Sequence, residues 1–288
     1  MSETRRWSKE IFFLLLPALT FVLLVFIFPF FYGLYLSLTV KGAQELTLEN
    51  YVKFFTDPFE RQTIWTTLKI SMPVAVLSTI LAIPLAYYMR RGLKHEKLVT
   101  FFLILPTTLG MVLVAEGMLT FFGPNGWFNQ LLVAAGVVKE PLQLTHNYTG
   151  VFISLFIQNF PMGFLLLLGY VSGINPTLEK AATTLGANKR QIFWRVMFPL
   201  MTPGISIAFC INFTASFSVF SSAIMVGAPS GPTRSLAYAA YNWSYERYNQ
   251  NFGSTITIVM VAIQLLIIGI VFAWRQKMYR GTSMVGKG

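Results

Sequence analysis

Polar side chains inside the apolar stretches of this chain are its main candidates for chemistry, because a polar group in a membrane is costly and usually faces protein or water. Glu116 is the acid we place within such a stretch, and Asn159, Asn212 and Ser216 are neutral candidates. Carboxylate, amide and hydroxyl groups at such positions can bind a polar or cationic solute, which indicates a path through the membrane. Two structural alternatives stay open. Glu116 can pair with Lys69, and the hydroxyls can bond carbonyls of their own helix.

Patterns for catalysis, metal binding and nucleotide binding are weak. The two histidines, His95 and His146, fall in loops expected on opposite sides of the membrane, so they cannot share a metal ion with each other or with Cys210. The C-terminal GTSMVGKG begins like a phosphate-binding loop but has Gly288 where a Mg²⁺-binding hydroxyl is required. We therefore expect no catalytic residue, no metal and no cofactor, and any ATP must be hydrolysed by a partner.

The composition is that of a membrane protein with several spans. Hydrophobic residues make up 55% of the chain and charged residues 11%, whereas an ordinary soluble chain carries about 25% charged residues. Each apolar run is long enough to cross a hydrocarbon layer of about 30 Å. The runs are 11–38, 63–89, 98–122, 150–172, 200–227 and 254–274. The sequence therefore predicts an all-α fold, a polytopic membrane helical bundle of six transmembrane helices.

The net charge of +11 follows from an asymmetry between the two sides of the predicted membrane. Of the 22 Lys and Arg residues, 15 lie in segments on the side of both termini and 6 in the opposite loops. Basic segments are retained in the cytoplasm. We therefore expect both termini and the loop 173–199 to be cytoplasmic, and we expect no nucleic-acid partner.

That loop contains the longest polar interval with helical order. Asn175 can cap a helix, and Gly186 stands where a left-handed helix end is easiest to form. The residues between them place apolar side chains at i, i+3, i+4 and i+7, which predicts one narrow apolar stripe. The stripe consists of Leu178, Ala181, Ala182 and Leu185.

A second helix is expected directly after the glycine. Asn188 and Gln191 have the spacing of a reciprocal capping pair. The apolar side of this helix consists of Ile192, Phe193, Val196 and Met197. Pro199 and Pro203 then indicate the return into the membrane. Two short helices joined at a glycine, beside a bilayer, are suited to docking a partner.

The loop resembles the cytoplasmic EAA loop of ABC importer permeases, whose pattern is Glu-Ala-Ala, three residues, Gly, nine residues, then Ile-x-Leu-Pro. Positions 181, 182, 186 and 199 match in register, and Val196 and Phe198 substitute for the apolar pair. One departure is that Lys180 occupies the motif's Glu position, with the acid one residue earlier at Glu179. The resemblance implies that an ATPase is contacted through Glu179, Lys180, Ala181, Ala182, Leu185, Gly186, Val196 and Pro199.

The same resemblance implies an assembly in a bacterial inner membrane. It predicts a second permease subunit, identical or related, two cytoplasmic ATP-binding subunits, and a periplasmic or lipid-anchored substrate-binding protein. Residues 1–62 would form a cytoplasmic tail, the first span and a periplasmic loop. Residues 63–274 would form the permease core with its coupling loop, surrounded by membrane lipids, and 275–288 a cytoplasmic tail.

The loop and the arrangement of spans look most like the spermidine/putrescine branch of these permeases. This likeness implies a polyamine or a related small polar or charged solute. A sugar-type permease remains an alternative. An ion-gradient-driven secondary transporter is a second alternative and would require a titratable group such as Glu116, while a membrane scaffold would carry no flux.

Overall fold

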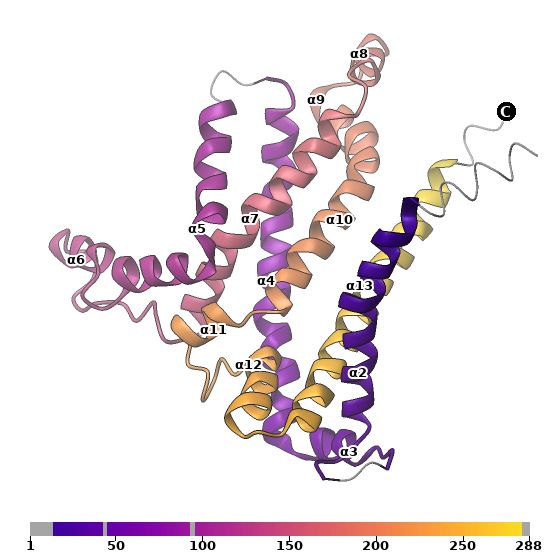
Figure 1. Ribbon diagram of the computed structural model, residues 1–288. Coiled ribbons are helices and arrows are strands. Elements are labelled where there is room, and N and C mark those ends of the chain that lie inside the picture. The colour runs from indigo at the N-terminus through magenta and orange to yellow at the C-terminus, as the bar shows by residue number, and fades with distance from the viewer. Residues whose placement is uncertain (1–13, 43–44, 93–95, 284–288) are drawn as a thin grey trace, which may run out of the picture. The chain divides into compact units, whose positions relative to one another are not determined.

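The computed structural model describes residues 14–42, 45–92 and 96–283, which form helices joined by loops (Figure 1). No β-strand occurs in these ranges, so the predicted all-α class is confirmed. His95, Gly288 and the first basic residues lie outside the described residues. The elements are η1 (Leu23–Ile27), α2 (Phe28–Ser37), α3 (Glu49–Thr56), α4 (Pro58–Met89), α5 (Glu96–Phe122), α6 (Trp127–Ala134), α7 (Tyr148–Ser172), α8 (Thr177–Thr184), α9 (Lys189–Ile192), η2 (Phe193–Met197), α10 (Phe198–Phe217), α11 (Ser221–Met225), α12 (Leu236–Tyr241), η3 (Asn242–Glu246) and α13 (Gln250–Ser283).

Within the described residues, six helical stretches are long and apolar enough to cross a membrane, as predicted. They are Leu14–Ser37, Pro58–Met89, Lys97–Ala134, Tyr148–Ser172, Lys189–Phe217 and Gln250–Lys277. The number and order of the spans agree with the sequence. The third and the fifth have different limits.

The fifth stretch begins earlier and ends earlier than the predicted run 200–227. Its helix starts at Lys189, inside the loop, and ends at Phe217. Pro199 does not interrupt it, because the preceding residues form the wide π-type turn η2 and the proline sits in the first turn of α10. The second loop helix and the fifth span are therefore one continuous rod.

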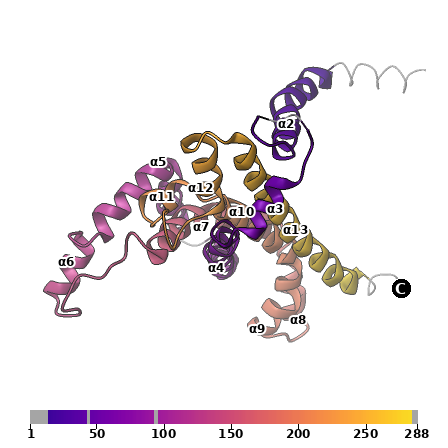
Figure 2. The same ribbon diagram turned by 90° about the horizontal axis from the view of Figure 1, so that it is seen from below.

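The third stretch changes direction in the middle. Gly110 has φ +75° and ψ 159°, a conformation outside the helical region that glycine adopts at little cost. The part of α5 after Gly110 leads sideways to α6 (Figures 1 and 2). The segment between the third and fourth predicted runs, 123–149, thus contains a helix of its own.

The chain divides into two compact units, and the first comprises Met1–Arg61 and Ala239–Met260. Hydrogen bonds link its distant segments. The Trp243 indole donates to Glu60 Oε1 at 2.8 Å, and the Asn251 amide donates to Thr39 Oγ1 at 2.8 Å. Phe54 is fully buried. These contacts thus hold the described part of the loop between the first and second spans in place.

The second unit comprises Gln62–Tyr238 and Val261–Gly288 and holds the candidate site. In it α7 packs against α10 and α5, and α4, α7 and α10 lie side by side (Figures 1 and 2). Their main apolar cluster continues into the loop helices. Its buried members are Ala82, Ala86, Tyr87, Met89, Phe164, Leu167, Val171, Ile192, Met197, Met201 and Ala208.

Candidate functional site

The loop between α7 and α10 folds as its local signals predict. Asn175 Oδ1 accepts the Thr177 N–H at 2.9 Å at the start of α8. Asn188 and Gln191 exchange side chain to backbone hydrogen bonds of 2.9 Å in both directions. Gly186 between the helices has φ +82°. Each helix end is therefore satisfied within the loop.

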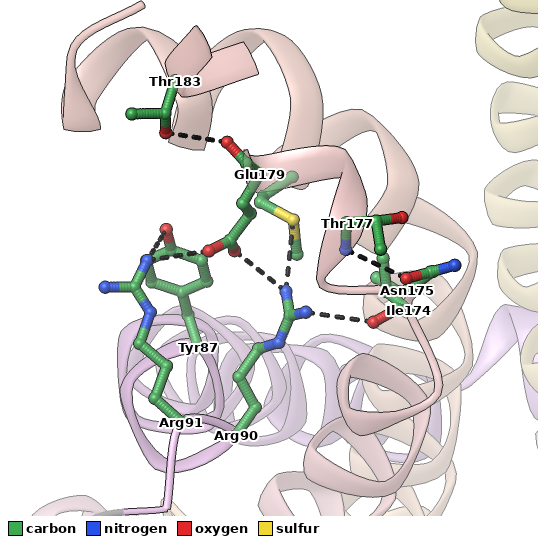
Figure 3. Close-up of polar contacts among 9 residues, drawn as sticks. Tyr87, Arg90, Arg91, Ile174, Asn175, Thr177, Glu179 and Thr183 are labelled. Carbon is green, nitrogen blue, oxygen red and sulfur yellow. Dashed lines mark hydrogen bonds and ion pairs between the residues drawn. The ribbon is translucent and has the colours of Figure 1, made fainter. Parts of the chain in front are cut away.

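Glu179 fastens this loop to the end of α4, which the sequence did not predict (Figure 3). Its two carboxylate oxygens contact Arg90 Nη1 and Arg91 Nη2, each at 3.1 Å. Arg90 also donates to the Ile174 carbonyl at 3.0 Å and contacts the Met197 sulfur at 3.2 Å. One arginine thereby joins α4, the end of α7, α8 and η2.

The two ion pairs of Glu179 differ in strength. The Arg90 side chain is 6% exposed and that of Glu179 18%, so their attraction is weakly screened. The Arg91 side chain is 43% exposed and contributes less. Arg91 also donates to the Tyr87 hydroxyl at 2.6 Å. Glu179 thus makes the structural contact one position before the motif's Glu, and Lys180 in that position is exposed.

The predicted apolar stripe on α8 separates onto two faces. Ala182 packs on the apolar cluster of α4, α7 and α10. Leu178 and Leu185 point away from it and are 43% and 88% exposed, and Ala181 is exposed between them. The helix therefore presents a small apolar face that nothing in the described chain covers.

The remaining loop candidates belong to the continuous rod. Ile192 and Met197 are buried in the cluster of α4, α7 and α10. Val196 and Pro199 are half-buried on the same rod. The loop and the fifth span are therefore joined by continuous helix with no break between them.

Three of the four path candidates come together between α7 and α10. The Asn159 amide donates to Ser216 Oγ at 2.9 Å, and both side chains are buried. Asn212 is 1% exposed, and neither of its amide atoms has a hydrogen-bond partner among the described residues. It lies against Gly163, where a Cβ would overlap the amide. Gln158, also on α7, donates to Ser154 Oγ of its own helix at 2.8 Å and to Ser222 Oγ of α11 at 3.1 Å.

Glu116 is not part of this group. It lies on the part of α5 beyond Gly110, and its side chain is exposed. Glu116 and Lys69 are both among the described residues, and they form no ion pair with each other. The pairing of Glu116 with Lys69, which the sequence left open, is therefore not found within one chain.

The described residues contain no cluster of His, Cys, Asp and Glu able to hold a metal ion. The arrangement instead connects a short exposed helix to two of the membrane-spanning helices. A short helix with an exposed apolar face is fixed by an ion pair to one span and continues, through a capped turn, into another span.

Comparison with known proteins gives a family match over most of the chain. The model of the family described as "Binding-protein-dependent transport system inner membrane component" matches residues 78–281. The match includes α7 to α11 and the whole loop. It therefore contains the ion pairs of Glu179 and the polar interface of α7 and α10.

Relatives and solved structures agree with that match. The spermidine/putrescine transport system permease protein PotB of Haemophilus influenzae is 26% identical over 91% of this chain and 88% of its own length. The sn-glycerol-3-phosphate transport system permease protein UgpA of Brucella abortus is 25% identical over 92% and 94%. In fold, a chain of a bacterial alginate ABC transporter in complex with a pentasaccharide-bound periplasmic protein has a TM-score of 0.80, at 20% identity over 96% of both chains.

Proposed function

Because the chain belongs to the family of binding-protein-dependent transport system inner membrane components, we propose that it couples a cytoplasmic ATPase to solute movement through its own spans. It is a permease-type membrane subunit of an ABC importer. ATP hydrolysis would take place in the partner, and α8 would be the contact.

The exposed apolar face of α8 is the observation that carries this proposal. Leu185 is 88% exposed although the helix beside it is firmly held. Together with exposed Leu178 and Ala181 it forms an apolar patch, and an exposed apolar patch is typical of a partner site. The Glu179 pairs and the continuous rod supply the connection from such a partner to two spans.

The orientation that this requires has α8 and both termini in the cytoplasm. The excess of Lys and Arg on that side supports it. Closure of two ATPase subunits would then displace α8 and α9, and the fifth span with them. Such a step shifts the population between inward-open and outward-open forms only if the loop binds the closed and open ATPase differently.

For the solute we propose a small polar or charged molecule, with a polyamine as the first candidate. The likeness to a spermidine/putrescine permease supports a polyamine as the solute. The likeness to an sn-glycerol-3-phosphate permease supports a competing class of solute. Glu116, exposed on α5, would attract a cation. Asn159, Asn212 and Ser216 would face the path only in a state in which α7 and α10 separate, since the pair is closed here.

The proposal is tested by recovery of the ATP-binding subunit with the membrane subunit. Leu185→Asp should reduce recovery at least about tenfold, because a charge replaces a buried contact at the interface. Val137→Asp is the matched control, since Val137 is also strongly exposed, at 68%, but lies in the loop after α6, outside the candidate spans. Equal recovery with both variants would remove α8 as the contact.

A further inference from the structure

A pocket of about 360 Å³ lies between the end of α4 and the start of α9, beside the ion pair of Arg91 with Glu179. Its polar side consists of Arg91, Lys189 and Arg190. Its apolar side includes Pro84, Tyr88 and Phe193. No acidic residue lines it. The pocket therefore combines three cations with an apolar wall.

Two of these cations are uncompensated. Arg91 shares Glu179 with Arg90 (Figure 3). Lys189 and Arg190 form no ion pair with any described residue, and both are exposed. Adjacent cations on a short, capped helix repel each other unless an anion lies between or near them. The charge balance of the pocket favours an anionic ligand.

An apolar track leads along α4 to this pocket. Leu77, Leu81, Pro84 and Tyr88 follow one another at i, i+4, i+7 and i+11 and are all exposed, so they share one outer face of the helix. The last two residues of this track along α4, Pro84 and Tyr88, also line the pocket. Trp194, which is 55% exposed, follows the pocket residue Phe193 in η2. Exposed aromatic residues at the end of a span are typical of the boundary between acyl chains and headgroups.

We propose that this pocket binds the headgroup of an anionic phospholipid, with an acyl chain lying along the outer face of α4. The lipid phosphate contacts Lys189 and Arg190, and the acyl chain covers Leu77 and Leu81. Basic pockets between spans at the cytoplasmic surface are suited to such headgroups. This inference rests on the proposed membrane orientation, and it adds a lipid site beside the coupling loop.

Lipid binding to the purified full-length chain in detergent tests this directly by native mass spectrometry. Phosphatidylglycerol and phosphatidylcholine with the same acyl chains are titrated separately. The expected preference for phosphatidylglycerol is about tenfold or more, since two cations near a surface each favour an anionic lipid. Equal binding of the two lipids would overturn the proposal. The measurement needs neither ATPase nor transport, so its outcome is independent of the coupling role.

Variants locate the preference. The double change Lys189→Gln and Arg190→Gln should abolish it, whereas the charge-conserving Lys189→Arg and Arg190→Lys should retain it. The matched control, Lys180→Gln with Arg195→Gln, removes two exposed cations of the same loop outside the pocket and should also retain it. Loss of the preference in the control would mean general attraction to the basic loop and would refute a defined site.

Two further arms identify the source of the phosphate and the occupant. Inorganic phosphate and glycerophosphoglycerol, which lack acyl chains, should not displace the lipid at equal concentration. Displacement by either would show a site for free anions and contradict the apolar track. Addition of the ATP-binding subunit should leave the lipid bound, and its displacement would show that the pocket is a protein contact instead.

Discussion

The loop around Glu179 and the α7–α10 interface around Asn212 are both polar, but their polar groups are satisfied in different ways. In the loop the Glu179 carboxylate has partners within the chain, Arg90 and Arg91, and an apolar face is left without a cover. At the α7–α10 interface the Asn212 amide has no partner among the described residues, while its surroundings are closely packed. The loop is thus a finished support with a free contact surface. The interface is a closed packing that retains unused hydrogen-bonding capacity.

This difference separates two kinds of function. A rigid support with an exposed apolar face suits a permanent or recurring protein contact. A buried amide without partners is costly, by about 1–3 kcal/mol for such a group. We propose that Asn212 finds its hydrogen-bond partners in a second conformation, in which it meets solute or water.

Removal of the Glu179 carboxylate should give the largest effect. Glu179→Ala leaves Arg90 buried without its counter-charge, which costs about 3–5 kcal/mol when one partner of a buried pair is removed. We expect a clear loss of thermal stability in detergent and loss of transport. Arg90→Met combined with Glu179→Met should recover much of the stability. Stability returns because no buried charge is then left without a partner. Transport should nevertheless stay low if the ion pair carries the movement from the loop to α4.

Wild-type stability of Glu179→Ala would contradict the fastening of α8 to α4. Full transport by the double Met variant at normal abundance would reduce the pair to a packing contact. Lys180→Ala serves as the control in the same helix, since Lys180 is exposed and forms no ion pair with a described residue.

An intermediate effect is expected at the α7–α10 interface. In Gly163→Ala the new methyl overlaps the Asn212 amide, so the helices must separate, and overpacking of this kind costs about 1–3 kcal/mol. Abundance and thermal stability should fall. Gly169→Ala on the same helix is the control, because a methyl there meets nothing within 4 Å. Asn212→Ala added to Gly163→Ala should restore stability, and failure to do so would show that another contact causes the loss.

The smallest effect is expected at Glu116. Its side chain is exposed and does not pair with Lys69, so Glu116→Gln should leave abundance unchanged. Uptake of a cationic solute such as spermidine should fall by about fivefold at most, as for one exposed charge contact. The comparison with an anionic solute, sn-glycerol 3-phosphate, distinguishes the solute classes. A fall in abundance that Lys69→Met restores would mean that the two residues pair after all.

Much of the fold followed from local sequence. Long apolar runs indicate spans wherever they occur, and the capping residues Asn175, Asn188 and Gln191 act on backbone groups two or three positions away. Gly186 likewise needs only its own backbone to end a helix. The ends of the two loop helices were therefore predictable from the sequence.

The rest depended on distant residues. Arg90 and Glu179 are 89 positions apart, so no periodicity links them, although the paired arginines at the end of a span were a visible signal. The bend at Gly110 lies within an apolar run where one glycine does not alter the pattern. The fifth span was misplaced because Pro199 was interpreted as a boundary, whereas the wide turn η2 accommodates it.

The central claim is that α8 presents its apolar face to an ATPase on the cytoplasmic side. The most direct measurement is labelling of Leu185→Cys with a membrane-impermeant thiol reagent in inside-out and right-side-out vesicles, with and without the ATP-binding subunit. The native Cys210 is buried and gives the background. We predict labelling only in inside-out vesicles, and protection when the ATP-binding subunit is bound. Labelling from the outer side, or labelling unchanged by a bound ATP-binding subunit, would contradict the claim.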